Sequence, residues 1–191
     1  MEEIDINICI PNYNYGNYLD QTLNSLYAQE DKNFKVYISD NCSNDNSLDV
    51  IRKWSSKFVE FEWQQNESNI GFAGNLDAVG RMVKTGYMIM LSSDDMVLPR
   101  AVSDYKNLIN HLNQSEYKKF VLGSLAIKVD EKGKEISLLE KDSKTWNEND
   151  IDPELSKTFG TTIYKVKANE MIRRCLTHFR TPLPFLSVCY P

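Results

Sequence analysis

Two adjacent carboxylates, Asp94 and Asp95, are the residues of this chain whose type and position best suit chemistry. They follow, after two serines, the apolar run Tyr87 to Leu91, which has the length of a buried strand and begins after Gly86. Acids at the carboxyl end of a buried strand lie where open α/β sheets bind ligands. Because adjacent carboxylates repel each other unless a cation offsets them, the pair predicts a divalent metal that carries a phosphorylated ligand.

Two further polar segments, residues 11–17 and 40–45, follow predicted strands in the same way. Parallel strands point their carboxyl ends at one edge of the sheet, so these segments and the acid pair are expected to line that edge together. Residues 69–75 open a predicted helix and are expected to cover the same edge. One such loop would be unremarkable, but several in order predict a ligand site.

The elements that must position these loops alternate between strand and helix patterns over the first half of the chain. Strands are predicted over residues 6–10, 34–38, 59–63 and 87–91. Helices with an apolar stripe are predicted over residues 19–27, 48–58, 76–83 and 99–112. This alternation predicts an α/β fold with a mostly parallel central sheet, right-handed crossovers and flanking helices.

The second half of the chain has a less regular pattern. Strands are predicted over residues 120–125 and 161–166, a hairpin-like turn at 131–134 and a helix over 168–178. The polar, acidic segment 142–157 is predicted to be mobile or a loop over the site. Residues 182–191 are apolar and lack any charged side chain, so we expect a domain that is cut short at this end.

The composition excludes several classes of protein. The 191 residues, 41% of them hydrophobic, suffice for one domain with a sizeable core, and the net charge of −5 does not support a nucleic-acid footprint. Cys9, Cys42, Cys175 and Cys189 include no C-x-x-C pair, so we expect no zinc ribbon and a reduced, intracellular protein. The N-terminus lacks a signal-peptide pattern, and no apolar run reaches the length of a transmembrane helix.

Several segments, taken in order, resemble family-2 glycosyltransferases of the GT-A fold. They are Ile8–Asn14, Tyr18–Gln29, Val36–Asp45 with its D-[DN]-x-S-x-D pattern, Asn69–Asn75, and Gly86–Pro99 around the acid pair. The resemblance implies a single GT-A-type domain, with residues 1–115 as its nucleotide-sugar-binding half and residues 116–191 as an incomplete acceptor-side half. It also implies transfer of a sugar from a nucleotide-diphosphate sugar to a hydroxyl acceptor, with inversion, in bacterial surface polysaccharide synthesis.

The resemblance implies a nucleotide site on the first two loops. Pro11, Tyr13 and Asn14 would cup the nucleotide, with Tyr13 bordering the base. Asp40 would accept a hydrogen bond from uracil N3–H, a task that suits a carboxylate because it offers only acceptors. Asn75 would complete the site. This contact favours a uridine nucleotide, but thymidine presents the same N3–H group and is an alternative.

The resemblance gives the acid pair separate roles. Asp94 would lie near the ribose or the donor sugar, and Asp95 would bind Mn²⁺ or Mg²⁺, which bridges the two phosphates. Such a metal stabilises the charge that develops on the leaving diphosphate. The family pattern has a further acid where this chain has Ser92, so the metal is expected to bind more weakly here.

The catalytic residue stays unassigned. Inverting transfer needs a base that takes the proton of the acceptor hydroxyl, and the family supplies an acid well after the metal ligand. Residues 182–191 contain no carboxylate. Four acids in the second half are available but stand in no recognisable context: Asp150, Asp152, Glu154 and Glu170.

Structural explanations and other functions remain open. The acid pair or Asn75 could cap a helix, and Asp40 could form an Asx-turn. The alternative function is a nucleotide-sugar-binding module without transfer activity, which Ser92 and the missing base favour. A sugar nucleotidyltransferase needs a glycine-rich loop after the first strand, where only Gly16 stands, and a receiver domain needs its acid pair there.

The expected partners are a nucleotide sugar, UDP-linked by preference, and a saccharide or lipid-linked saccharide acceptor, with no nucleic acid. We expect a cytoplasmic protein and leave open both peripheral association with the inner face of the membrane and the oligomeric state. Which sugar is transferred cannot be read from the residues.

Overall fold

The computed structural model describes residues 4–114, 127–129, 134–138, 148–160, 163 and 165. These residues belong to two compact units, the first containing residues 4–114 and the second containing the described residues from 127 onward. The predicted boundary between two halves near residue 115 stays a prediction.

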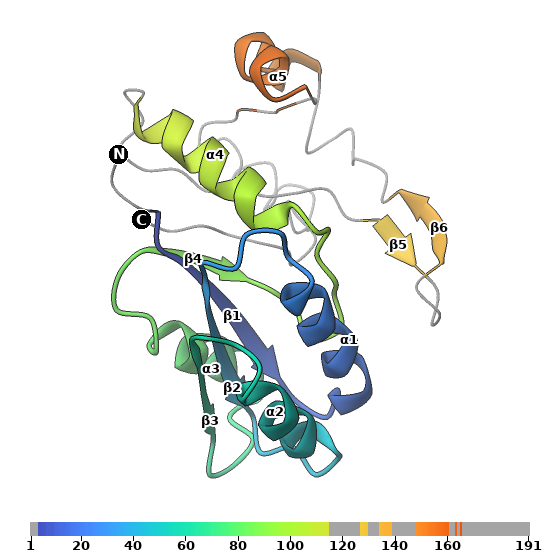
Figure 1. Ribbon diagram of the computed structural model, residues 1–191. Helices are drawn as coiled ribbons and strands as arrows, with labels where there is room; N and C mark the ends of the chain where they lie inside the picture. The colour runs from blue at the N-terminus through green and yellow to red at the C-terminus, as the bar shows by residue number, and fades with distance from the viewer. Residues whose placement is uncertain are drawn as a thin grey trace. The chain divides into compact units, whose positions relative to one another are not determined.

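A four-stranded parallel sheet forms the centre of the first unit (Figure 1). Its strands are β1 (Ile6–Asn12), β2 (Lys35–Asp40), β3 (Phe61–Gln65) and β4 (Tyr87–Met90), in the spatial order β3-β2-β1-β4. The connecting helices are α1 (Gly16–Tyr27), α2 (Ser47–Ser55) and α3 (Gly71–Gly80), and α4 (Ala101–Asn113) follows β4. All three strand pairs are parallel, which confirms the predicted α/β fold and the order of its elements.

Apolar side chains cover both faces of the sheet, which explains the almost continuous apolar run of β1. Successive strand residues point to opposite faces, so Ile8 and Cys9 enter different cores. Ile8 joins the larger core with residues of α1, α2 and α4, among them Leu23, Ile51 and Ile109. Cys9 joins the smaller core under α3, where burial raises the pKa of its thiol to about 12 and keeps it protonated.

The chain reverses direction across the sheet after β3. The strands β1, β2 and β3 follow one another outward, and β4 then returns to the other side of β1. Right-handed crossovers place α1 and α2 on one face and α3 on the opposite face (Figure 1). The topological switch point therefore lies between β1 and β4, where the loops after these two strands leave the sheet.

The third strand and the third helix are among the elements whose bounds differ from those predicted. The third strand begins at Phe61 rather than residue 59, because Val59 is 94% exposed and lies outside the sheet. The third helix begins at Gly71 rather than residue 76 and ends at Gly80. Its early start is stabilised by Asn69 and Asn41, whose side-chain oxygens accept from the N–H groups of Gly71 and Ile70 at 2.9 Å each.

The second unit contains a short hairpin and a helix. Strands β5 (Ile127–Val129) and β6 (Glu135–Leu138) pair antiparallel on either side of the predicted turn. A 3₁₀ turn, η1 (Glu148–Asp150), and the start of α5 (Pro153–Phe159) fall in the segment 142–157 that was predicted to be mobile or a loop, so that prediction was wrong for its described residues 148–157. Asp152 caps α5 by accepting from two backbone N–H groups, Pro153 occupies its first turn, and Gly160 ends it in the left-handed conformation. The predicted strand 120–125, helix 168–178 and most of strand 161–166 lie outside the described residues.

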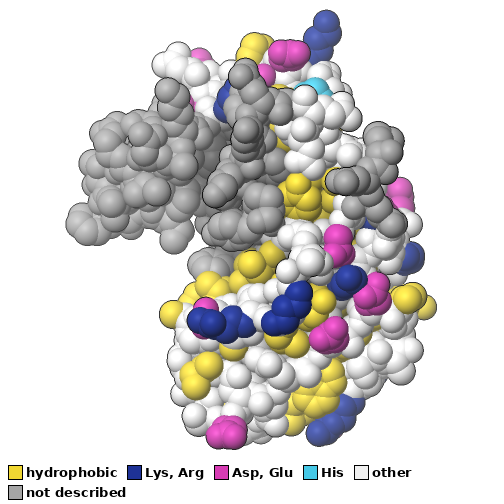
Figure 2. Space-filling view, turned by 90° about the vertical axis from the view of Figure 1, so that its left-hand side faces the viewer, with side chains coloured by type: hydrophobic (Ala, Val, Ile, Leu, Met, Phe, Trp, Pro, Cys, Tyr) yellow, Lys and Arg dark blue, Asp and Glu magenta, His cyan; other side chains and the backbone are white. Residues whose placement is uncertain are grey.

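Charges of both signs are mixed over the molecular face drawn in Figure 2, where Lys and Arg lie beside Asp and Glu. In the first unit, Arg81 pairs with Asp77 at 2.7 Å, and Lys35 pairs with Glu60 at 3.6 Å. The described part of that face therefore lacks the single-sign basic stripe of a nucleic-acid footprint. Within the described ranges, no helix combines the length and apolar character needed to cross a membrane.

Candidate functional site

The predicted loops meet at the carboxyl edge of the sheet. The end of β1 pairs with the end of β2, so that Asn12 lies opposite Asp40. The backbone N–H of Asn41 donates to the carbonyl of Asn12 at 2.9 Å, and that of Leu91 donates to the carbonyl of Cys9 at 2.9 Å. The loops after β1, β2 and β4 are thus adjacent, as the sequence predicted, and they surround the switch point.

The loop after β1 is bound to the loop after β2 by reciprocal hydrogen bonds. The backbone N–H of Asn14 donates to Ser43 Oγ at 2.9 Å, and Asn14 Oδ1 accepts from the N–H of Asn44 at 2.8 Å. Asn14 adopts the left-handed conformation, with φ of 55°, that an asparagine tolerates in such a turn. Tyr13, next to it, is 41% exposed, and Pro11 is half-buried at the end of β1. Of these three predicted nucleotide residues, Tyr13 presents the largest side-chain surface to a ligand.

Asp40 is fully buried and accepts four hydrogen bonds from the chain. Its Oδ1 accepts from Asn12 Nδ2 at 2.8 Å and Ser43 Oγ at 2.6 Å. Its Oδ2 accepts from the backbone N–H of Ser43 at 2.9 Å and from Gln65 Nε2 at 3.2 Å. These four donors satisfy the buried charge. A base N–H would reach this carboxylate by taking the place of one of them, and the bond to Gln65 is the longest.

A network of asparagine side chains closes the edge beside Asp40. Asn66 Nδ2 donates to Asn41 Oδ1 at 3.1 Å and to Asn75 Oδ1 at 3.0 Å, while Asn41 Nδ2 donates to Asn69 Oδ1 at 2.8 Å. Asn75 is buried and also donates to the carbonyls of Asn12 at 3.2 Å and Ser39 at 3.0 Å. The predicted site residue Asn75 therefore holds the ends of β1 and β2 and caps no helix.

The sequence did not single out Asn41 and Asn66 as site residues. Asn41 occupies the second position of the D-[DN]-x-S-x-D pattern, which was the available signal, whereas Asn66 stands in no motif. Asn12 is a third such residue, fully buried between β1 and β2. Its Nδ2 binds Asp40, and within the described part of the chain its Oδ1 has no hydrogen-bond partner.

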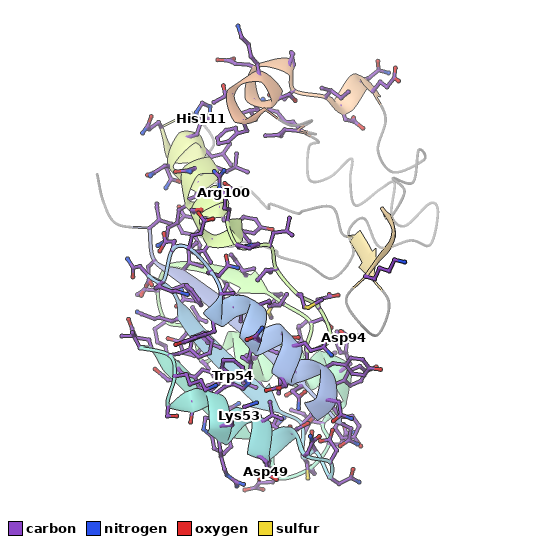
Figure 3. The ribbon with its side chains drawn as sticks, turned by 45° about the vertical axis from the view of Figure 1, so that its right-hand side comes forward. Asp49, Lys53, Trp54, Asp94, Arg100 and His111 are labelled. Atoms are coloured by element: carbon purple, nitrogen blue, oxygen red, sulfur yellow. The ribbon has the colours of Figure 1, made fainter. Side chains whose placement is uncertain are left out.

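Asp94, on the loop after β4, is labelled in Figure 3, and Asp95 follows it in the chain. Asp94 is exposed and accepts a hydrogen bond from Ser92 Oγ, so the serine that replaces an acid of the family pattern binds the acid two residues on. Asp95 is half-buried, and its N–H donates to the carbonyl of Ser92 at 3.2 Å. Burial, together with the neighbouring carboxylate of Asp94, raises the pKa of Asp95. A cation at this pair would relieve that repulsion.

The acid pair fits a metal that obtains most of its ligands elsewhere. Among the residues that the structure describes, no three His, Cys, Asp or Glu side chains gather as a closed metal site. Mg²⁺ commonly binds through one or two carboxylates and completes its shell with water and phosphate oxygens. Asp94 and Asp95 match that donor set, provided that a phosphorylated ligand binds beside them.

The acids considered as a base lie within the residue range of the second unit. Asp152 Oδ1 accepts from the N–H groups of Glu154 and Leu155 at 3.1 and 2.9 Å, and its Oδ2 lies 3.6 Å from Lys165 Nζ. These contacts give Asp152 a structural role as a helix cap. Glu154 is exposed in the first turn of α5, and Asp150 ends η1. Glu170 lies outside the described residues.

Comparison with known proteins assigns this arrangement to a family. The profile of the family described as Glycosyl transferase family 2 matches residues 7–177. Abequosyltransferase RfbV of Salmonella typhimurium strain LT2 is 33% identical over 93 residues, which are 47% of this chain and 28% of that protein. Poly(ribitol-phosphate) beta-N-acetylglucosaminyltransferase TarS of Staphylococcus aureus strain Mu50 is 29% identical over 100 residues, 51% of this chain and 17% of that protein.

Among solved structures, S. aureus TarS 1-349 in complex with UDP superposes with a TM-score of 0.56 and 25% sequence identity, covering 66% of this chain and 36% of that chain. The chain thus spans about a third or less of the length of these relatives. The parallel sheet flanked by helices is the architecture of GT-A glycosyltransferases, as predicted. The family profile matches well over half of the chain, and the chain therefore belongs to glycosyl transferase family 2.

Proposed function

We propose that this chain is the donor-binding part of a glycosyltransferase that moves a sugar from a nucleotide-diphosphate sugar to a hydroxyl acceptor with inversion. The observation that carries the proposal is the acid pair Asp94–Asp95 beside the loop after β1, at the switch point of a family-2 chain. Ligands of open α/β sheets bind at such a point, and a diphosphate with its metal is the ligand that an adjacent acid pair suits.

The nucleotide would lie over the ends of β1 and β2. Tyr13 borders the base with its exposed ring, while Pro11 and Asn14 shape the loop beneath it. Asp40 accepts the N3–H of a uracil in place of the donor Gln65 Nε2. Asn75 keeps the two strand ends at the spacing that this contact needs.

Mn²⁺ or Mg²⁺ would be held by Asp95, with Asp94 directed at the ribose or the donor sugar. When bound, the metal neutralises the charge of the leaving diphosphate. The raised pKa of Asp95 supports this role, because a carboxylate that is costly to charge in the empty site gains most from a cation. Ser92 contributes a hydrogen bond to Asp94 and no charge, so the metal is expected to bind only moderately.

The uridine preference has support from one relative. TarS, at 25% identity over two thirds of this chain, was solved with UDP. The relatives' names concern the transfer of abequose and, in TarS, of N-acetylglucosamine on poly(ribitol-phosphate). By analogy we propose a saccharide or lipid-linked saccharide acceptor of a bacterial surface polysaccharide. The cytoplasmic location and an association with the inner face of the membrane remain predictions from the sequence.

Calorimetric titration of UDP with and without Mn²⁺ tests the donor site. We expect binding that requires the metal in the wild-type chain and is lost in Asp95→Asn. Asp77→Asn, which removes an exposed acid on α3, is the matched control and should bind as the wild type does. Metal-independent binding, or unchanged binding by Asp95→Asn, would contradict the assignment of Asp95.

The second candidate is a binding module that holds the nucleotide sugar without transferring it. The serine at position 92 favours it, because the site has one acid fewer than the family pattern. Incubation with UDP-sugars and a saccharide acceptor, with assay of both the released UDP and the glycosylated acceptor, separates the two functions. Turnover would establish a transferase, whereas metal-dependent binding without turnover by the longest natural form of the protein would establish the module.

A further inference from the structure

Helix α1 and the turn that ends it carry three polar side chains beside the loop of the acid pair. Thr22 and Ser25 are spaced three residues apart, so they lie on one side of the helix, and Gln29 follows just after the helix ends. The apolar stripe of α1, which includes Leu19, Leu23 and Leu26, enters the larger core. Thr22, Ser25 and Gln29 are separate from that stripe and contact the segment from Ser93 to Val102.

Thr22 and Ser25 bind the loop immediately before and after the two acids. Thr22 Oγ1 donates to the carbonyl of Ser93 at 3.0 Å, and both residues are buried. Ser25 Oγ accepts from the N–H of Val97 at 3.1 Å. The first contact lies one residue before Asp94 and the second lies two residues after Asp95. The backbone that carries the acid pair is therefore fixed at both ends by hydroxyl groups of α1.

Gln29 fixes the next part of the same segment. Its Nε2 donates to the carbonyl of Leu98 at 2.8 Å, and its Oε1 accepts from the N–H of Val102 at 3.1 Å. Val102 lies in the first turn of α4, whose N-cap residue Arg100 makes no side-chain cap. Gln29 therefore satisfies an N–H group that the helix itself leaves unpaired. This contact determines where α4 begins, and Thr22 and Ser25 act closer to the acids.

We propose that Thr22 and Ser25 are positioning residues that set the affinity of the acid pair for a divalent cation. The inference rests on the proposed function. Carboxylates bind a metal most tightly when the protein already holds them in the binding orientation. Mutation of residues that orient metal ligands typically lowers the metal affinity by about 10- to 100-fold. Hydrogen bonds at both ends of a short loop provide that orientation without touching the metal.

The test measures Mn²⁺ affinity at a fixed UDP concentration, by calorimetry, for four variants. Thr22→Val keeps the shape of the side chain and removes its hydroxyl, while Thr22→Ser keeps the hydroxyl. Ser25→Ala removes the second contact at a half-buried position, where loss of folding is a smaller risk. Val50→Ala, in the core on α2, is the control for a general loss of packing.

We expect Mn²⁺ to bind about tenfold or more weakly in Thr22→Val and Ser25→Ala, and as in the wild type in Thr22→Ser and Val50→Ala. Without metal, UDP should fail to bind to any of the four variants, as to the wild type. Hydrogen exchange of the empty protein gives a second measurement, in which the amide of Val97 exchanges faster in Ser25→Ala. Wild-type metal affinity in both hydroxyl-deleted variants would overturn the inference, whereas a wild-type chain that binds UDP without metal dependence would overturn the proposed function itself.

Discussion

The side-chain amide of Asn12 donates a hydrogen bond to Asp40 Oδ1 at 2.8 Å, between two side chains that are fully buried. This bond joins the last residue of β1 to the last residue of β2. It connects the loop that would border the nucleotide to the acid that would read its base. Its burial makes both residues sensitive to substitution, and it leads to the first prediction.

Asp40→Ala is expected to lower the free energy of unfolding and to reduce the preference for UDP over ADP. The variant leaves several buried donors without an acceptor, each costing about 1–3 kcal/mol. Urea unfolding measures the first effect, and titration of the two nucleotides measures the second. Gln65→Ala is the control, because it removes one donor to Asp40 and keeps the carboxylate. A folded Asp40→Ala chain that still prefers UDP would show that Asp40 only supports the loop.

Metal-free Asp95→Asn is expected to be more stable than the wild-type chain at neutral pH. Burial and the adjacent Asp94 raise the pKa of Asp95, so its charged form opposes folding. The charge on Asp95 therefore lowers the stability of the wild type relative to Asp95→Asn as the pH rises from the ordinary Asp pKa, about 3.9, through the raised value. Below that window the carboxyl and the amide are both neutral, and the difference disappears. Thermal unfolding of the wild type and of Asp95→Asn at about pH 3 and about pH 7 measures the difference in stability below and above this pH window. Equal melting temperatures of the wild type and Asp95→Asn at about pH 7 would contradict the prediction.

Ser92→Asp is expected to raise the affinity for the metal and to lower the free energy of unfolding of the metal-free protein. The new carboxylate would face Asp94, which now accepts from the serine hydroxyl, and would add to the repulsion in the pair. A third acid adds negative charge for the cation, so Mn²⁺ affinity at fixed UDP should rise. Ser92→Asn adds size without charge, so it should change neither the metal affinity nor the stability of the metal-free protein. If both variants bound Mn²⁺ equally, charge at position 92 would not limit the metal.

Gly16→Ala is expected to destabilise the chain by about 1–3 kcal/mol, because a Cβ there overlaps its surroundings. The added atom would lie 2.7 Å from the backbone nitrogen of Ser47 and would collide with the side chain of Asn46. The N–H of Gly16 also donates to Asp45 Oδ2 at 2.9 Å. Urea unfolding measures the loss, and Gly160→Ala at the end of α5, where the conformation is left-handed but the space is open, separates backbone strain from overlap. Unchanged stability in Gly16→Ala would mean that the β2 loop moves aside freely.

The strands of the sheet could be predicted because β1 and β2 are buried on both faces and β4 is apolar and mostly half-buried. β1, β2 and β4 stand out as apolar runs, whereas the edge strand β3 alternates and was placed two residues early. Helix α5 was missed because it has a single buried residue, Leu155, and therefore no stripe. Its start signal, Asp152 followed by Pro153, was present but lay within an acidic segment.

The positions of the candidate site residues in the fold could be predicted as far as strand ends define them, while their role in binding stays a prediction. The acid pair, Asp40 and the loop after β1 were located because polar residues directly follow apolar runs. The contacts that hold them could not be predicted in the same way. Thr22 meets Ser93 across 71 residues, and Asn75 meets Asn12 across 63. No periodicity connects positions so far apart, because only the folded sheet brings them together.

Helix α1 touches both halves of the candidate site, and this has a thermodynamic consequence. Its first residue, Gly16, binds Asp45 of the loop after β2, and Thr22 and Ser25 bind the loop of the acid pair. A shift of this helix would change the two halves together. Cooperativity between two ligands is reciprocal, so whatever factor the metal adds to the affinity for the nucleotide, the nucleotide adds to the affinity for the metal. Substitutions along α1 should therefore alter one shared coupling constant, which can be read from either titration alone.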